Sequence, residues 1–359
     1  MDATGTSTPS GITLAAERSG AWLDAVRAGV EEELAALLHL PRESRLDPRW
    51  GCALAAVRAY ALRPAKRIRP ALVEAGWALA RDDATVPGAV RRFGAGIEVL
   101  HTFLLVHDDV ADAAVERRGG AALHRLLAPG RAGEDLAVVV GDHLFARAVD
   151  AMLGCGARRA AAVVRYYLGV CRETAAGQYL DLALTRVPIA DVSLFETLRV
   201  ALLKTARYGF VAPLACGARL AGAPRGRLAA LERLGRHVGL AFQLRDDLLD
   251  LFGDARLTGK QSARDVARRK PTFPVVAAYA RASAPARREL DALWASPDDD
   301  APAARVRALV DAHGGRVATE RVIARASETA RRTLAALPDA GGIRAALDHL
   351  VGSLAGRAA

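Results

Sequence analysis

The sequence has few cysteines. Its 359 residues include only four, Cys52, Cys155, Cys171 and Cys216, and none of them belongs to a Cys-x-x-Cys pair. A chain of this length does not need disulfides to supplement its core, so we expect buried thiols in a reducing compartment and a cytoplasmic protein.

Long apolar runs are also missing. The segment Met1–Ser10 has no basic stretch followed by an apolar core, so it does not look like a signal peptide. No uninterrupted apolar run approaches the roughly 18 residues of a membrane span, so we expect none. Residues 1–12 are rich in Ser, Thr and Gly, and we expect them to be disordered.

The sequence also lacks a concentrated block of like charge. Lys and Arg outnumber Asp and Glu by 50 to 40, but the arginines are spread along the chain without neighbouring stacking aromatics. This distribution argues against a nucleic-acid partner. A small polyanionic substrate would explain the local basic clusters equally well.

What the chain has in abundance is helix-forming sequence. Aromatic residues make up 5%, apolar residues 52%, and Ala, Leu and Arg are common. Apolar residues recur at helical spacing over eleven segments, and Pro or Gly lies in many of the breaks between them. We predict an all-α protein, with residues 13–359 forming one domain of antiparallel helices joined by short loops. The predicted helices cover 14–40, 70–80, 90–115, 136–153, 160–184, 194–220, 228–252, 273–282, 306–313, 316–337 and 343–354. Only Val138-Val139-Val140 hints at a strand.

Two clusters of aspartates lie inside apolar helical sequence. Asp108, Asp109 and Asp112 form one DDxxD pattern, and Asp246, Asp247 and Asp250 form the other. On a helix the three carboxylates of such a pattern share one face. Two other groups are interpreted as solvated loops: Asp82-Asp83, which precedes Val86-Pro87-Gly88, and Asp298-Asp299-Asp300, which follows Pro297.

Clustered carboxylates among Leu, Val and Phe are unfavourable unless a cation neutralises them. Like charges at this spacing destabilise a helix by about 0.2–0.5 kcal/mol per pair, and burial adds to the cost. Magnesium prefers oxygen ligands and commonly bridges carboxylates to a substrate phosphate. Two such helices facing each other would form a cleft for a metal-bound phosphate. A solvated helix face explains one cluster but explains two poorly.

Basic residues accompany both clusters. They lie in Lys66–Pro70, at Arg117-Arg118, at Lys204 within a helix, and at Lys260 and Lys270. Each alone would be interpreted as a surface charge, but together they can neutralise phosphate groups.

Taken in order, these segments resemble the trans-type polyprenyl synthetases, from about residue 64 to residue 274. The resemblance rests on Lys66-Arg67-Ile68-Arg69-Pro70, Glu98–Thr102, His107–Asp112, Arg117-Arg118-Gly119, Gly141-Asp142, Gly177–Asp181, Lys204-Thr205, Phe242–Asp250, and Gly259-Lys260 with Asp265, Lys270 and Thr272. The sequence departs from the family at Pro64-Ala65, where Gly-Gly is usual, and at Arg269, where Gly is usual. Both departures concern loop geometry.

The resemblance implies a fold and a metal site. The implied fold is a helical bundle around a deep central cavity, assembled as a homodimer. Three magnesium ions are implied to hold an allylic diphosphate on the two Asp clusters. Matching positions make Asp108, Asp112 and Asp246 the closest ligands, supported by Asp109, Asp247, Asp250 and Asp265.

The resemblance also implies two substrates. An allylic diphosphate (dimethylallyl, geranyl or farnesyl) would be held by Lys204 and Lys260, helped by Arg117, Gln243 and Lys270. Isopentenyl diphosphate would be held by Lys66, Arg69, His101 and Arg118. Pyrophosphate leaves, the isopentenyl double bond attacks the allylic cation, and the released proton goes to pyrophosphate. Thr205, Gln178 and nearby carbonyls would shield the cation. For His107 we expect helix packing against a backbone carbonyl.

Product length is implied by the fifth and fourth positions before the first Asp, here Phe103 and Leu104. One aromatic residue followed by a small aliphatic one resembles the geranylgeranyl (C20) pattern, with farnesyl (C15) or a longer chain as alternatives. Ideal helix geometry instead places Leu105 and His101 on the Asp face.

Two other functions are kept open. A class I terpene cyclase shares the first DDxxD, but its second metal motif normally contains Asn, Ser and Glu. A non-catalytic partner subunit of a heteromeric synthase would typically lose one cluster, and both are intact here.

Overall fold

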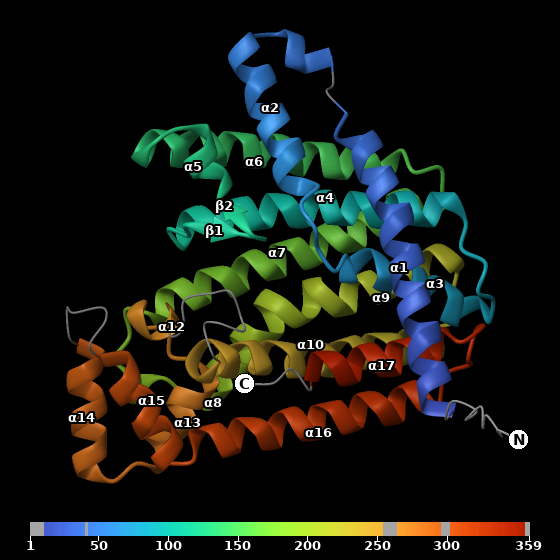
Figure 1. The fold of residues 1–359 in the computed structure, drawn as a ribbon. Helices are drawn as coiled ribbons and strands as arrows, with labels where there is room; N and C mark the ends of the chain where they lie inside the picture. The colour runs from blue at the N-terminus through green and yellow to red at the C-terminus, as the bar shows by residue number, and fades with distance from the viewer. Residues whose placement is uncertain (1–10, 40–41, 254–263, 296–301, 356–359) are drawn as a thin grey trace, which may run out of the picture. The chain divides into compact units, whose positions relative to one another are not determined.

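The computed structural model describes residues 11–39, 42–253, 264–295 and 302–355 (Figure 1). Throughout these residues the chain is almost entirely helical, which confirms the all-α prediction. The strands in this part of the chain are β1 (Glu116–Arg117) and β2 (Gly120–Ala121), which pair antiparallel as a short hairpin.

The chain divides into two compact units, each assembled from separate segments. Unit 1 comprises residues 1–165, 216–224 and 338–349, and unit 2 comprises residues 166–215, 225–337 and 350–359. The single domain expected for residues 13–359 stays a prediction.

Unit 1 is built around the helix that carries the first Asp cluster. This helix, α4 (Gly88–Ala111), packs against α6 (Gly130–Leu153), α3 (Ile68–Arg81) and α1 (Gly11–Leu37). Figure 1 shows α4 and α6 side by side. The contact is close at Gly141, where an added Cβ would lie 2.3 Å from the His107 Nε2 atom, so a larger residue there would displace the His107 ring. Three shorter helices complete this part of the chain: η1 (Arg42–Arg45), α2 (Pro48–Ala61) and α5 (Leu123–Leu127).

Unit 2 is built around α10 (Arg225–Phe252), which carries the second Asp cluster. It packs against η3 (Ala201–Val211) and α16 (Gly315–Ala335). Residues of α7 (Ala160–Leu184), α9 (Ala212–Ala221) and α17 (Ile343–Ala355) belong to both units. The described residues of unit 2 also form η2 (Ile189–Asp191), α8 (Leu194–Val200), α12 (Arg264–Ala267), α13 (Phe273–Arg281), α14 (Ala284–Ala295) and α15 (Pro302–Ala312).

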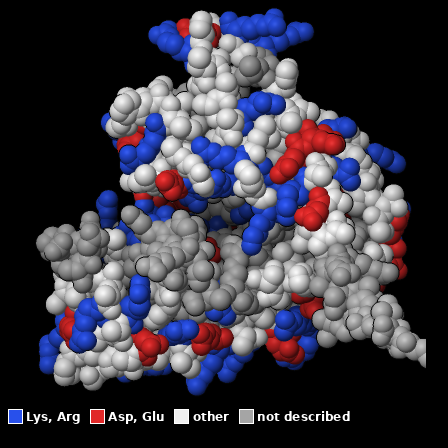
Figure 2. Space-filling model, viewed as in Figure 1, with Lys and Arg blue, Asp and Glu red and all other residues white. Residues whose placement is uncertain are grey.

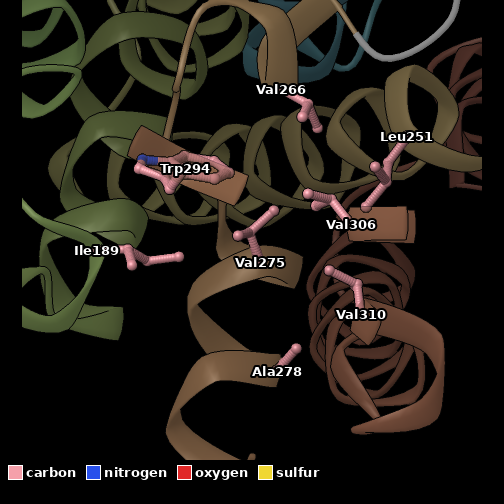
Figure 3. Packing of buried hydrophobic residues seen from close by; sticks show 8 residues of the cluster. All are labelled: Ile189, Leu251, Val266, Val275, Ala278, Trp294, Val306 and Val310. Carbon is pink, nitrogen blue, oxygen red and sulfur yellow. The ribbon is translucent and has the colours of Figure 1, made fainter. Parts of the chain in front are cut away.

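An apolar cluster in unit 2 fixes the segment that follows the second Asp cluster. Val266 of α12 packs with Leu251 of α10, Val306 and Val310 of α15, and Trp294 of α14 (Figure 3). Burying each such side chain contributes about 1.5–3 kcal/mol. This packing holds α12, and therefore Asp265, near the end of α10.

The helices differ from the predicted ones in several places. Helix α4 ends at Ala111, not at residue 115, and α1 begins at Gly11, inside the segment expected to be disordered. The residues Val138-Val139-Val140 are helical, within α6. Helices α2, α5, α12 and α14 were not predicted. The predicted helix 194–220 contains a π-helix over Ala201–Val211.

Charges of both signs are interspersed on the face drawn in Figure 2. On that face the net positive charge of the chain is not gathered into one basic patch. Across the described residues, no helix combines the length and the apolar character that crossing a membrane would require.

Candidate active site

The first Asp cluster lies at the C-terminal end of α4. Asp109 is fully buried, and both of its carboxylate oxygens accept hydrogen bonds. The Tyr60 hydroxyl donates to Oδ2 at 2.8 Å, and Arg117 Nε donates to Oδ1 at 2.8 Å. Arg117 Nη2 also contacts Asp109 Oδ1 and lies 3.5 Å from Asp108 Oδ2. Arg117 therefore bridges two aspartates of the cluster.

Asp112 is the residue that caps this helix. It lies just past the last helical residue, and its backbone N–H donates to the Asp108 carbonyl at 2.8 Å. This hydrogen bond continues the helical turn as far as Asp112. Asp112 therefore stays one turn from Asp108, even though α4 ends earlier than predicted. Asp108 and Asp112 are partly exposed, unlike Asp109.

Arginines gather around the buried His101. Burial lowers the pKa of His101 well below its usual value, and the charges of Arg69, Arg118 and Arg117 lower it further. The imidazole is therefore neutral at pH 7, and the local charge is carried by the guanidinium groups. A cluster of cations with a neutral hydrogen-bonding ring among them is suited to a phosphate anion.

A buried ion pair supports this arginine cluster. Arg67 Nη1 donates to Glu98 Oε1 at 3.0 Å, and Arg118 Nη2 lies 3.3 Å from the same oxygen. Arg67 also donates to the carbonyls of Ala61 and Arg63. Arg67 thus points inward, while its neighbours Lys66 and Arg69 are exposed and partly buried, respectively. Removing one partner of such a buried pair would leave an uncompensated charge.

The second Asp cluster adjoins a pocket within unit 2. The pocket is lined by residues of α7, α8, η3, α10, α12 and α13, among them Asp181, Lys204, Thr205, Gln243, Asp247, Asp265 and Lys270. Lys204, Gln243 and Lys270 are residues that the resemblance assigned to the allylic diphosphate, and Asp247 and Asp265 are residues that it assigned to the metal. Within this unit, the structure therefore brings together six of the predicted residues: Lys204, Thr205, Gln243, Asp247, Asp265 and Lys270.

Asp181 holds the two pocket lysines. Lys204 Nζ lies 2.6 Å from Asp181 Oδ2, and Lys270 Nζ lies 3.3 Å from the same atom. Burial would raise the pKa of Asp181, but the two ammonium groups outweigh it and hold that pKa below its usual value. The carboxylate is charged at neutral pH and fixes both lysines at the pocket wall.

A short hydrogen-bonded chain leads from η3 to the Asp cluster. The Thr205 hydroxyl donates to Gln243 Oε1 at 2.6 Å, and Gln243 Nε2 donates to Asp247 Oδ1 at 2.8 Å. This chain fixes the amide orientation of Gln243. Gln243 therefore lies at the pocket wall beside Asp247.

Two carboxyl groups beside the pocket lie where the charged form of a carboxyl is disfavoured. Burial and the neighbouring Asp265 raise the pKa of Asp247 well above its usual value. Burial and the neighbouring Asp250 raise the pKa of Asp265 to about 7. Asp265 also donates its backbone N–H to Asp250 Oδ2 at 2.9 Å. A cation among these groups would relieve the repulsion.

The helix that presents Lys204 and Thr205 is a π-helix, a form that is rare and frequent at functional sites. It approaches α7 closely at Gly177. A Cβ added there would lie 2.5 Å from the Lys204 backbone nitrogen and 2.8 Å from the Leu203 carbonyl carbon. Glycine is therefore required for α7 and η3 to meet.

Phe103 packs within unit 1 against two aromatic rings. Its ring centroid lies 4.6 Å from that of His107 and 5.4 Å from that of Phe145 on α6. His107 Nε2 lies 3.1 Å from the Val138 carbonyl oxygen, which confirms the expected helix-packing role of this histidine.

The other predicted residues differ in their placement. Phe103, Leu104 and Gln178 are all partly buried. Lys260, predicted to bind diphosphate, lies outside the described residues, as do Asp298, Asp299 and Asp300.

The carboxylates fit a cation that draws some of its ligands from elsewhere. Among the described residues, no three His, Cys, Asp or Glu side chains are placed to hold a metal ion by themselves. Magnesium usually takes one or two carboxylates and completes its shell with water and substrate phosphate oxygens. The oxygen donors present and the raised pKa values of Asp247 and Asp265 fit an ion of that kind.

The helical fold, the two Asp clusters and the basic groups beside them define a class of protein. Residues 52–312 match the polyprenyl synthetase family, and the chain belongs to that family. It is a prenyltransferase.

The chain is also similar to individual members of this family. The chain is 37% identical over 281 residues to a geranylgeranyl diphosphate synthase of Mycobacterium tuberculosis, covering 77% of this chain and 75% of that protein. It is also 37% identical over 257 residues to a (2E,6E)-farnesyl diphosphate synthase of Mycobacterium bovis, covering 70% and 68%. Among solved structures it resembles a geranylgeranyl pyrophosphate synthase of Corynebacterium glutamicum complexed with isoprenyl diphosphate and magnesium. That similarity has a TM-score of 0.83 and 28% identity, over 94% of this chain and 99% of the other.

Several residues of the site were not predicted from the sequence. Asp181 lies three residues after Gln178 in a motif that was recognised, so its acidic side chain was the available signal. Glu98 and Arg67 likewise lie inside recognised motifs. Tyr60 lies in a helix that was not predicted at all, and its partner Asp109 is 49 residues away.

Proposed function

We propose that this enzyme joins isopentenyl diphosphate to an allylic diphosphate head to tail and releases pyrophosphate, with a C20 product. The observation that carries the proposal is the pocket in which Lys204, Lys270, Thr205 and Gln243 adjoin the second Asp cluster. Two intact Asp clusters support chain elongation over a terpene cyclase or a non-catalytic subunit.

The chain's own residues bind and orient the two diphosphates. We assign Lys204, Lys270, Arg117 and Gln243 to the allylic diphosphate, together with Lys260. We assign Lys66, Arg69, His101 and Arg118 to isopentenyl diphosphate. The neutral imidazole of His101 and the surrounding guanidinium groups support the second assignment. Charge-assisted hydrogen bonds of this kind are short and strong.

Asp108, Asp112 and Asp246 would hold magnesium, supported by Asp109, Asp247, Asp250 and Asp265, and we propose three ions. Bound there, the metal supplies positive charge that stabilises the departing pyrophosphate. Lys204 and Lys270 add to that charge from the pocket wall. The magnesium in the Corynebacterium structure supports the choice of ion.

The bond changes balance without a side-chain base. The allylic C–O bond breaks and its electron pair leaves with pyrophosphate, which generates an allylic cation. The isopentenyl double bond attacks this cation, and the proton then lost goes to pyrophosphate. Thr205, Gln178 and backbone carbonyls of the π-helix would shield the cation from water.

Product length is assigned to Phe103, with Leu104 beside it. Each added isoprene unit buries five carbons, worth up to about 4 kcal/mol at roughly 0.8 per carbon group, so growth continues until a side chain blocks it. The edge contacts of Phe103 with His107 and Phe145 restrain its ring and support this role. Because the chain is 37% identical to both a C20 and a C15 synthase, C15 is the second candidate product.

The decisive experiment is product analysis of the purified protein. It would be incubated with isopentenyl diphosphate, magnesium and each of the dimethylallyl, geranyl and farnesyl primers, followed by dephosphorylation and chromatography. We expect linear C20 alcohol. Cyclic hydrocarbons would indicate a terpene cyclase, and no product without a second protein would indicate a partner subunit.

Phe103→Ala tests the length assignment. Removing the ring that is proposed to block the growing chain should shift the products to C25 or longer. Phe195→Ala is the matched control, because that ring is 70% exposed and lies on α8. An unchanged product distribution for Phe103→Ala would remove Phe103 from the mechanism of length control.

We further propose a cytoplasmic homodimer. No disulfide joins the four cysteines, all of which lie in the described residues, and this supports a reducing compartment. Helix α6 exposes Leu136, Val139 and Leu153 by 49%, 58% and 49%, which supports burial against a second copy.

A further inference from the structure

The end of helix α2 is connected to the first Asp cluster and to the β1–β2 hairpin. Tyr60 lies in the last turn of α2, and Arg63 follows the helix by two residues. The hairpin carries Arg117 in β1 and Arg118 at the turn. Neither Tyr60 nor Arg63 is among the residues proposed to bind substrate or magnesium.

Tyr60 reaches Arg117 through one buried carboxylate. Its hydroxyl donates to one oxygen of Asp109 at 2.8 Å, and Arg117 Nε donates to the other at 2.8 Å. Tyr60 and Asp109 are both 0% exposed, so water does not compete for these hydrogen bonds.

Arg63 holds the backbone of the same hairpin. Its Nη1 atom donates to the carbonyls of Arg117 and Ala121, both at 2.9 Å. Its guanidinium carbon lies 5.0 Å from the centroid of the Tyr60 ring, in cation–π contact. Arg118 sits in the left-handed region with φ of 52°, a conformation that needs support from its surroundings.

We propose that Tyr60 and Arg63 are positioning residues that orient Arg117 toward the allylic diphosphate, Tyr60 through Asp109 and Arg63 through the hairpin carbonyls. Neither touches substrate. This inference rests on the proposed role of Arg117. Besides its proposed support of the magnesium site, Asp109 links Tyr60 to Arg117, since its two oxygens accept hydrogen bonds from these two side chains.

The primary variant is Tyr60→Phe, which removes only the hydroxyl. Losing a buried hydrogen bond to a charged group should raise the Michaelis constant for the allylic diphosphate roughly fivefold to tenfold. The Michaelis constant for isopentenyl diphosphate should not change. Val57→Ala is the matched control, because Val57 is buried in α2 one turn earlier and makes only packing contacts. A purely structural role for Tyr60 would give both variants the same kinetic constants.

Arg63→Met provides a second, independent variant. It keeps an apolar side chain of similar length and removes the two hydrogen bonds to the hairpin. We expect the same selective rise in the allylic Michaelis constant, with partial recovery in Arg63→Lys. Equal effects on both substrates, in this variant and in Tyr60→Phe, would overturn the inference.

Arg117→Ala separates the inference from the proposed function. If Arg117→Ala leaves the allylic Michaelis constant unchanged, the assignment of Arg117 to that substrate fails. If it raises the constant but Tyr60→Phe does not, only the positioning role fails. If Tyr60 acts through Arg117, the double variant Tyr60→Phe/Arg117→Ala should be no worse than Arg117→Ala alone. Additive losses would overturn the proposed route.

Discussion

The aspartates of the two clusters have the same spacing but different surroundings. In the first cluster the middle residue, Asp109, accepts hydrogen bonds from Tyr60 and Arg117. In the second cluster the middle residue, Asp247, accepts one from the Gln243 amide and lies near the carboxyl of Asp265, and its pKa is raised. The first cluster is thus partly neutralised by the protein, whereas the second retains repulsion that a cation would relieve.

Replacing one outer aspartate in either cluster tests whether both are needed. Asp108→Asn or Asp246→Asn should lower kcat by roughly two to three orders of magnitude, because charge stabilisation of the leaving group is lost. Far-UV circular dichroism should show an intact helical fold. Asp82→Asn is the control, since Asp82 belongs to an exposed Asp-Asp pair after α3. Near-normal turnover in either cluster variant would contradict a two-cluster mechanism.

The raised pKa of Asp265 predicts how stability depends on pH without metal. Because the folded-state pKa is about 7 and the ordinary value is 3.8, the folded protein binds more protons than the unfolded chain between those values. Stability contributed by this group is therefore present at low pH and is lost as the pH rises toward 7.

Thermal unfolding in chelator checks this sign. The melting temperature of the wild type minus that of Asp265→Asn should be larger at pH 5.5 than at pH 8. Saturating magnesium should make this pH dependence weaker. A pH-independent difference between the two proteins would contradict the shifted pKa. Comparing variants is necessary because the lowered pKa of His101 acts in the opposite direction.

Sequence patterns predicted the charged residues of the site better than the residues that hold them. Asp, Lys and Arg at motif spacing carry a direct chemical signal. Tyr60 carries none, because its role depends on a contact with Asp109, 49 residues away. Such pairings depend on tertiary packing, which local periodicity does not encode.

At the scale of the helices, close approach decides where Lys204 lies. Helix α7 meets the π-helix η3 at Gly177, where an added Cβ would fall 2.5 Å from the Lys204 backbone nitrogen.

Most of the helices could be predicted from the sequence because their apolar residues recur regularly. Helix α2 was not, since alanines on several faces weaken its pattern. The π-helix was not predicted, because its apolar spacing is close to that of an α-helix.

Gly177→Ala and Gly169→Ala form a matched pair on α7. Gly177→Ala should destabilise the protein by about 1–3 kcal/mol through overpacking, and should lower turnover by displacing Lys204. Gly169→Ala should instead stabilise it by up to about 1 kcal/mol, since a Cβ there meets only an Arg172 nitrogen at 3.8 Å. Urea unfolding and steady-state rates would measure both. Equal effects of the two substitutions would contradict the close approach.

At the scale of the whole molecule, the exposed apolar residues of α6 predict self-association. Val139→Lys should weaken the proposed homodimer, because it places a charge in the contact. Light scattering after size-exclusion chromatography would give the mass. Val317→Lys on α16 is the control, since Val317 is similarly exposed at 46%. A monomeric wild-type protein would contradict the proposal directly.

The segmented make-up of unit 1 has a consequence for how the protein is synthesised. Residues 338–349 belong to this unit. Gly341 packs closely against Ala84, since a Cβ added to the glycine would lie 2.7 Å from the Ala84 Cβ. A ribosome adding about 5–20 residues per second needs roughly 10 to 40 s to proceed from residue 165 to residue 349. During that interval the N-terminal helices exist without their last partners. The apolar surface that residues 338–349 will cover is then open to chaperones, and a message truncated before this segment would yield a chain that cannot complete unit 1.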